Sequence, residues 1–188
     1  MKVSKKVSGV EYAIRDIVST AKDLEKHGKI IDYLNIGDPA QYGFHPPENV
    51  KQAYINAIRK DKNYYSDSEG IQELRSAIAE KENSKGLSIG ADNVLVTNGV
   101  SEGLDMIMSS IVEEGDEVLL PGPYYPPYAS YIRLHGGTPI EFSVDIEKST
   151  PDIDDIKSKI TPKTIAICLI SPNNPTGAVF EENSLKKL

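Results

Sequence analysis

Apolar residues recur at helical spacing in the first half of the chain, with polar residues between them. This period predicts helices over residues 9–27, 50–58 and 71–78, with Ser68 as the N-cap of the third. A short apolar run at 31–36, closed by a glycine and a proline, predicts a strand. We therefore expect three helices and one strand before residue 92.

From residue 92 onward, short apolar runs alternate with helical patterns over about 80 residues. Such alternation is typical of a parallel sheet with helices on both faces and right-handed connections. The expected fold class is therefore α/β with a mostly parallel sheet. In chain order the predicted strands are 93–97, 117–120, 139–142 and 164–170, and the predicted helices are 104–112, 124–135 and 152–159.

The composition excludes several classes of partner. A net charge of −7 over 188 residues, without a long basic cluster, makes nucleic acid and anionic membranes poor partners. The single cysteine, Cys168, lies in an apolar run and cannot form an internal disulfide, which favours a reducing compartment. The amino terminus lacks the apolar segment of a signal peptide. We expect a cytoplasmic protein without a metal site.

The segment Ser171–Gly177 carries the strongest local signal. An apolar run leads directly into a loop whose two prolines restrict φ and whose Gly177 permits backbone conformations that other residues resist. Such a loop can hold an asparagine amide still at the carboxyl end of a strand, where open α/β sheets bind ligands. An ordinary turn uses the same residue types, so this motif alone leaves both interpretations open.

Three further motifs lie at predicted turns. Backbone N–H groups of the turn Thr97–Gly103 can bind an anion at a helix N-terminus, with the hydroxyl of Ser101 as an added donor. The run Pro121–Tyr128 holds three tyrosines in a proline-stiffened loop, where one of them can stack on a planar ring. Gly37 would let a substrate approach the backbone closely. Plain helix capping, loop packing and a simple turn remain the alternatives.

Together these motifs describe a site for a planar aromatic ring that bears a phosphate. In this combination and order, the chain resembles the amino-terminal part of the class I/II aminotransferases, which are pyridoxal-phosphate enzymes of fold type I. Within that family it is most similar to alanine and aspartate aminotransferases. The resemblance covers essentially the whole chain and is carried by residues 35–39, 64–75, 97–103, 115–118, 121–128 and 171–177.

The resemblance implies pyridoxal 5′-phosphate as the cofactor and assigns roles to individual residues. Gly99, Val100 and Ser101 match the turn whose amides hold the cofactor phosphate, although Val100 and Ser101 depart from the glycine, lysine or threonine often found there. Tyr125 matches the aromatic residue that stacks on the pyridine ring, where many aspartate-type members have tryptophan. Asn174 matches the amide that bonds the cofactor's phenolic oxygen.

Two more positions follow from the same resemblance. Tyr65 matches a tyrosine that reaches the phosphate of the partner subunit's cofactor, which implies a homodimer with shared sites. Gly37 matches the backbone position beside the substrate carboxylate. The resemblance also implies an amino-terminal arm and small-domain segment over residues 1–45. Residues 46–188 are then part of a cofactor-binding large domain that is incomplete at its carboxyl end.

The implied reaction exchanges an amino group between an L-amino acid of alanine or aspartate type and a 2-oxo acid. In the family, the Schiff-base lysine lies several dozen residues beyond the loop that ends at Gly177, so no catalytic residue is predicted before Leu188. Lys157, Lys159 and Lys163 precede that loop and are interpreted as solvated charges. We therefore expect the 188-residue chain alone to be inactive.

Three other functions remain open. Other fold type I enzymes, such as C–S lyases and ring-closing synthases, use the same fold and cofactor. A non-catalytic sensor domain that binds pyridoxal phosphate would need an attached DNA-binding module, and the chain has no basic recognition helix. A generic nucleotide-binding α/β domain would explain the anion turn but not Tyr65, Tyr125 and Asn174.

Overall fold

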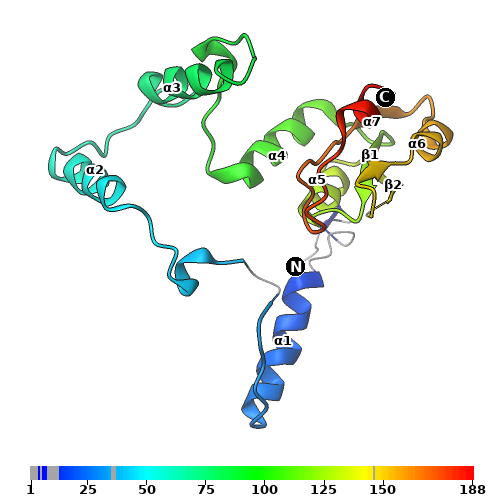
Figure 1. Ribbon diagram of the computed structural model, residues 1–188, viewed down its shortest axis with the longest axis horizontal. Helices are drawn as coiled ribbons and strands as arrows, with labels where there is room; N and C mark the ends of the chain where they lie inside the picture. Colours follow the sequence, from blue (N-terminus) through cyan, green and yellow to red (C-terminus); the bar gives the residue numbers. More distant parts are fainter. Residues whose placement is uncertain (1–3, 5, 8–12, 35–36, 146) are drawn as a thin grey trace. The chain divides into compact units, whose positions relative to one another are not determined.

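The computed structural model describes residues 4, 6–7, 13–34, 37–145 and 147–188, and the chain forms two compact units. Unit 1 comprises residues 1–22 and 99–188, and unit 2 comprises residues 23–98. Figure 1 shows how the chain passes through the helices of unit 2 and then enters the sheet of unit 1.

A four-stranded sheet in the order β3–β2–β1–β4 forms the centre of unit 1. β1 (Glu117–Gly122) pairs in parallel with β2 (Thr138–Asp145) on one side and with β4 (Thr164–Ile167) on the other. The two-residue β3 (Thr150–Pro151) pairs antiparallel with the end of β2. The predicted parallel sheet is confirmed, and β3 is an edge strand too short for the sequence pattern to indicate.

The central strand β1 is buried on both faces. Val118, Leu119 and Leu120 are 0% exposed, which explains the unbroken apolar run in the sequence. Because successive side chains of a strand point to opposite faces, Val118 and Leu120 belong to one core cluster and Leu119 to another. Helices therefore cover both faces of the sheet, as predicted.

The first layer consists of α4 (Gly99–Ile111) and α5 (Pro127–Leu134). A hydrogen bond joins them, with His135 Nε2 at the end of α5 lying 2.7 Å from Asp105 Oδ1 on α4. This layer anchors the helix whose first turn was predicted to bind an anion. Its buried cluster contains Met108, Val112, Val118, Leu120, Ala129 and Ile132.

The second layer is α6 (Ile153–Lys159), whose Ile156 packs with Leu119 and Phe142. Asp152 caps this helix, since its carboxylate accepts from the N–H groups of Asp154 and Asp155 at 3.1 and 3.0 Å. This cap comes immediately before the apolar stripe. The helix begins at Ile153, within one residue of the start predicted from the sequence.

Polar contacts hold α6 on β2. The Lys159 ammonium donates to the Asp155 carboxylate and to the Glu141 carbonyl, both at 2.7 Å. Asp155 also accepts from the Ser143 N–H at 2.7 Å, and Lys159 with this N–H lowers the pKa of Asp155. The interpretation of Lys159 as a solvated charge is therefore wrong, because this lysine is half-buried and paired.

The outer face of β4 carries exposed aliphatic side chains. Ile165, Ile167 and Leu169 are 42%, 36% and 47% exposed, whereas the alternate residues Ala166 and Cys168 pack against the first core cluster. Within the described residues β4 is an edge strand of the sheet. We refer to Ile165, Ile167 and Leu169 as the β4 strip.

Unit 2 contains short helices joined by long loops. The helix α1 (Ala13–Lys26) crosses the boundary between the units, and the helices within unit 2 follow it along the chain. No side chain of α2 is buried, so its apolar stripe remains exposed. The helices are the 3-10 helix η2 (Pro39–Tyr42), α2 (Glu48–Arg59), α3 (Gln72–Asn83) and the 3-10 helix η3 (Ala91–Asn93).

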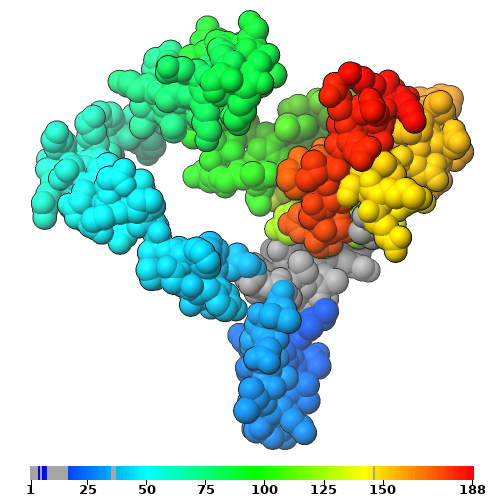
Figure 2. Space-filling view, in the orientation of Figure 1, coloured from blue at the N-terminus to red at the C-terminus, as the bar shows by residue number. Residues whose placement is uncertain are grey.

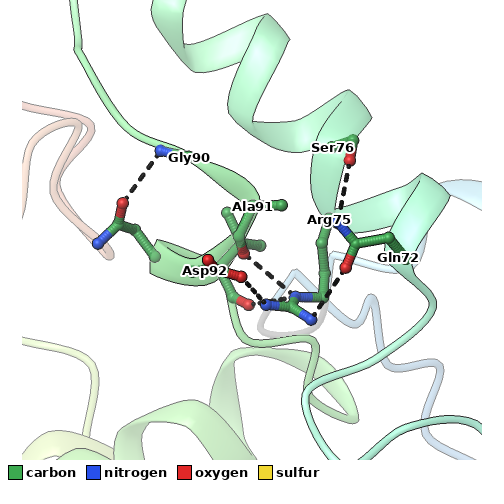
Figure 3. A network of polar contacts seen from close by, with 8 residues as sticks. Gln72, Arg75, Ser76, Gly90, Ala91 and Asp92 are labelled. Carbon is green, nitrogen blue, oxygen red and sulfur yellow. Dashed lines mark hydrogen bonds and ion pairs between the residues drawn. The ribbon is translucent and has the colours of Figure 1, made fainter.

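Arg75 of α3 joins this helix to the turn around η3 (Figure 3). Its side chain is buried, and Nε donates to the carbonyls of Ala91 and Val94 at 3.1 and 3.0 Å. The terminal nitrogens donate to Gln72 Oε1 and Asp92 Oδ1, each at 3.3 Å. A buried guanidinium must be satisfied in this way, so the network stabilises the end of unit 2.

Gly70 lets the loop before α3 pack directly on residue 96. Its φ is +104°, and a Cβ at this position would lie 2.6 Å from Val96 Cβ. The Val96 N–H donates to the Glu69 carbonyl at 2.9 Å in the same place. The loop before α3, which contains Tyr64 and Tyr65, is thus joined inside unit 2 to the segment that leads to Gly99.

Two predicted strands are not found. Residues 31–34 and 94–97 form no strand in the described part of the chain, and residues 35–36 lie outside it. Residues 91–93 form η3 instead. An extended apolar run becomes a strand only when a neighbour forms a ladder with it, and sequence periodicity does not identify that neighbour.

The remaining differences concern element ends. Ser68 does not cap α3, whose N-cap is Ile71 without a side-chain bond. α5 begins at Pro127 rather than at residue 124, because the preceding prolines shape a loop and Pro127 suits the first helical position. β4 ends at Ile167, and the short helix α7 (Glu182–Leu185) was not predicted. Residues 9–12 of the first predicted helix lie outside the described residues.

Replacing Arg75 with alanine is expected to lower the free energy of unfolding by about 2–3 kcal/mol, because two part-buried carbonyls lose their charged donor. Urea unfolding followed by circular dichroism measures this loss. The matched control is Arg59→Ala on the exposed end of α2, which should cost less than about 0.5 kcal/mol. Equal losses for the two variants would show that the network does not stabilise unit 2.

Burial raises the pKa of the Cys168 thiol. A higher pKa leaves less thiolate at any given pH, so at pH about 8.5 the folded chain should react with an aromatic disulfide reagent at least ~10-fold more slowly than the same chain in urea. For the same reason, the free energy of unfolding should fall as the pH rises past about 8.5, where the unfolded thiol ionises first. Equal reaction rates in both states would contradict the packing of Cys168.

Candidate functional site

Two loops leave the sheet of unit 1 at the same edge. Leu119 of β1 lies opposite Ile167 of β4, and the Cys168 N–H donates to the Leu119 carbonyl at 2.9 Å. Because the carboxyl ends of parallel strands meet at one edge, the segments that follow Gly122 and Cys168 emerge there together. They contain the two proline-rich motifs that the sequence singled out.

A buried asparagine joins these two loops. Asn173 is 6% exposed, and its Nδ2 donates to the Pro123 carbonyl at 3.2 Å across a sequence separation of 50 residues. Its Oδ1 accepts from the N–H and the hydroxyl of Thr176 at 3.1 and 3.0 Å. Both ends of the amide are therefore used, one within the loop of Asn173 and the other across to the loop that contains Pro123.

Backbone bonds close the second loop on itself. The Asn173 N–H donates to the Ala178 carbonyl, and the Gly177 N–H donates to the Asn173 carbonyl, both at 2.8 Å. The Phe180 N–H donates to Ser171 Oγ at 3.0 Å, and the side chains of Ala178 and Phe180 are buried. The loop is thus anchored although its segment, orange to red in Figure 2, lies at the surface of unit 1.

The two neighbouring asparagines have opposite surroundings. Asn173 is buried and bonded, whereas Asn174 is exposed between it and Pro175. The sequence motifs predicted Asn174 as the ligand-binding amide but missed the structural role of Asn173. The Asn-Asn pair inside a proline-restricted loop was the available signal, because two adjacent amides can divide packing and binding between them.

Tyr125 lies in the first of these loops, between β1 and α5. Its side chain is half-buried, and its carbonyl accepts from the Tyr128 N–H at 3.1 Å. Tyr124 and Tyr128 pack against the first core cluster together with Cys168, and burial, followed by the charge of Cys168, raises the pKa of Tyr128. The flanking tyrosines thus anchor the loop, while Tyr125 is the aromatic residue predicted to stack on a ring.

The predicted anion turn is the start of α4. Gly99 has a φ of +77°, a conformation that favours glycine, and the helix continues from it for 13 residues. Val100 is 74% exposed, and Ser101 is also exposed in the first turn. The backbone N–H groups of a helix N-terminus, the helix dipole and the Ser101 hydroxyl together make this end suitable for an anion.

Tyr65 and Gly37 belong to unit 2. Tyr65 is fully exposed and lines an open groove of about 480 Å³ with Lys62, Tyr64 and Asp67 among others. Gly37 precedes the η2 turn, and nothing lies within 4 Å of the place that a Cβ there would occupy. Both positions are accessible to a ligand within their own unit.

The described residues of unit 1 supply the groups that a flat, phosphate-bearing cofactor requires. Tyr125 offers an aromatic face, Asn174 an exposed amide donor, and the first turn of α4 an anion site with Ser101 as a hydroxyl donor. In donor chemistry the site therefore fits pyridoxal 5′-phosphate. The tethered pair of loops is the part of this site that the structure brings together directly.

Among the described residues, no cluster of three or more His, Cys, Asp or Glu side chains is arranged to hold a metal ion. None of the described helices combines the length and apolar character needed to cross a membrane. Lys157 and Lys163 are exposed.

Comparison with known proteins places these motifs in a family. Residues 30–188 match the family of aminotransferases of class I and II. A probable aspartate/prephenate aminotransferase of Aquifex aeolicus is 43% identical over 173 residues, which is 90% of this chain and 43% of that protein. The glutamate-pyruvate aminotransferase AlaA of Haemophilus influenzae is 40% identical over 98% of this chain and 46% of its own length.

A solved structure extends the match to the fold. The alanine aminotransferase from Pyrococcus furiosus superposes with a TM-score of 0.95 at 49% identity, covering 99% of this chain and 48% of that one. The chain thus spans about half the length of its relatives and has the α/β fold of fold type I aminotransferases over that half. The prediction from the sequence motifs is confirmed: the chain belongs to the aminotransferase class I and II family.

Proposed function

We propose that this chain is the amino-terminal part of a pyridoxal-phosphate-dependent aminotransferase. The whole enzyme exchanges an amino group between an L-amino acid of alanine or aspartate type and a 2-oxo acid. The observation that carries this proposal is the pair of loops joined by Asn173, which presents Tyr125 and Asn174 at one sheet edge of a chain that matches the family over residues 30–188.

The first turn of α4 holds the cofactor phosphate in this proposal. Gly99, Val100 and Ser101 form the start of α4, where backbone N–H groups can donate to phosphate oxygens and the helix dipole favours the negative charge. The Ser101 hydroxyl adds a side-chain donor. The exposed Val100 contributes its backbone alone.

Tyr125 and Asn174 orient the ring. The phenol of Tyr125 stacks on the pyridine face and limits rotation about the phosphate anchor. The amide of Asn174 donates to the phenolic oxygen and favours its ionised form. The bound cofactor supplies the electron sink for reactions at the substrate's α-carbon, while this chain supplies orientation and electrostatics.

The remaining assignments complete the proposal. Tyr65 reaches the phosphate of the second subunit's cofactor in a homodimer, and Gly37 borders the substrate carboxylate. Residues 1–45 form the arm and small-domain segment, and residues 46–188 form part of the large domain. The enzyme acts in the cytoplasm in amino-acid metabolism.

The native reading frame beyond Leu188 tests the proposal first. We expect it to continue with an aspartate and a tyrosine, then a lysine in a serine-rich turn, and later an arginine. The full-length protein should then transfer the amino group of alanine or aspartate to a 2-oxo acid. It should also retain that group on the cofactor when supplied with amino acid alone, which a β-eliminating enzyme would not do.

The 188-residue chain by itself is expected to show no turnover. Covalent catalysis requires a lysine to carry the cofactor, and a general base is needed at the substrate carbon. A coupled assay for the 2-oxo acid product, run at equal molar amounts of the chain and the full-length protein, measures the difference. Turnover by the purified chain would overturn the assignment of the catalytic lysine beyond Leu188.

Replacing Ser101 with alanine in the full-length protein should weaken cofactor binding about tenfold, because a hydrogen bond to a charged phosphate is lost. Equilibrium dialysis against pyridoxal phosphate gives the dissociation constant. Ser109→Ala is the matched control, since Ser109 lies on the same helix and its hydroxyl donates only to the Met106 carbonyl. Equal affinities for the two variants would remove Ser101 from the phosphate site.

A further inference from the structure

We infer that Asn173 is a positioning residue, which sets the place of Asn174 and Tyr125 by joining their two loops. This inference rests on the proposed function, because it concerns how the cofactor ring is held. It starts from the burial of Asn173 and from the bond between its Nδ2 and the Pro123 carbonyl at 3.2 Å.

The orientation of the Asn173 amide is determined by its neighbours. Oδ1 receives the Thr176 N–H at 3.1 Å, and a backbone N–H can only donate. Nδ2 faces the Pro123 carbonyl, which can only accept. The opposite orientation would place two donors together and two acceptors together, so the bond between the loops follows from the contacts themselves.

Proline limits the other bonds available between the loops. Pro123, Pro172 and Pro175 have no backbone N–H, so these positions cannot extend the ladder that ends with Cys168 N–H on Leu119 O. The side chain of Asn173 supplies a donor in that region. Since Asn173 directly precedes Asn174, and Pro123 lies two residues before Tyr125, the bond acts next to both groups that hold the ring.

Displacement of Asn174 has a spectroscopic consequence. An amide that donates to the ionised phenolic oxygen stabilises the deprotonated cofactor and lowers the pH at which its visible absorption changes. Loss of this donor raises that pH. Replacing a residue that has a purely structural role would change the stability of the protein without shifting the absorption midpoint.

Asn173→Asp separates the two uses of the amide. A carboxylate keeps an acceptor for the N–H and hydroxyl of Thr176, but it has no donor and faces the Pro123 carbonyl with a negative oxygen. The matched control is Thr176→Val. That variant removes the hydroxyl that bonds Asn173 and accepts from Ala178 N–H, while the bond to Pro123 remains.

The experiment is a pH titration of the visible absorption of bound pyridoxal phosphate in the full-length protein. Asn173→Asp should raise the midpoint by about 0.5–1 pH unit, in the direction produced by Asn174→Ala, and should weaken cofactor binding about 5–30-fold. Thr176→Val should leave the midpoint within about 0.2 pH unit. Thermal unfolding is measured in parallel. Asn173→Ser, which is too short to reach Pro123 and adds no charge, should shift the midpoint in the same direction, because the new carboxylate of Asn173→Asp by itself favours a protonated cofactor.

An unchanged midpoint in the Asn173 variant, or an equal shift in Thr176→Val, would overturn the inference. Failure of the proposed function gives a different result, because the unmodified full-length protein would then show no cofactor absorption or no transamination. Where the unmodified protein binds cofactor and reacts, the Asn173 titration tests the positioning residue alone.

Discussion

The parallel pairing of β1 with β2 and β4 is the constraint on which the rest of unit 1 depends. Both faces of β1 are buried, so its side chains contribute to two core clusters at once, and the helices on either side are held by the same strand. The parallel register also brings the ends of β1 and β4 to a common edge. The loops that carry Tyr125 and Asn174 start from that edge, so the site inherits its geometry from the core.

The polar contacts around the sheet follow one pattern. Arg75, Lys159 and Asn173 each use a half-buried or buried polar side chain to bond a backbone carbonyl on another segment. Such contacts are costly to break, because a buried or half-buried polar side chain then loses its partner. They join segments that apolar packing alone would leave free to slide, and one of them lies directly beside the predicted cofactor site.

Much of the fold was readable from the sequence, with limits that particular residues explain. The runs at 117–120 and 152–159 predicted β1 and α6 correctly, because hydrophobic periodicity is a local signal. The segments 31–34 and 94–97 were wrong as strands because pairing partners are not local. The order of the motifs predicted the site residues, while the bond between Asn173 and Pro123, 50 residues apart, could not be read from either motif alone.

The β4 strip bears on how the molecule behaves in solution. Its three branched aliphatic side chains, in alternate positions, present apolar surface to water along β4. Among the described residues β4 is an edge strand, and an exposed apolar edge strand is a template for association. The net charge of −7 opposes such association by mutual repulsion. Dilute buffers should therefore keep the chain dispersed, whereas sulfate, which screens charge and strengthens apolar contacts, should favour self-association.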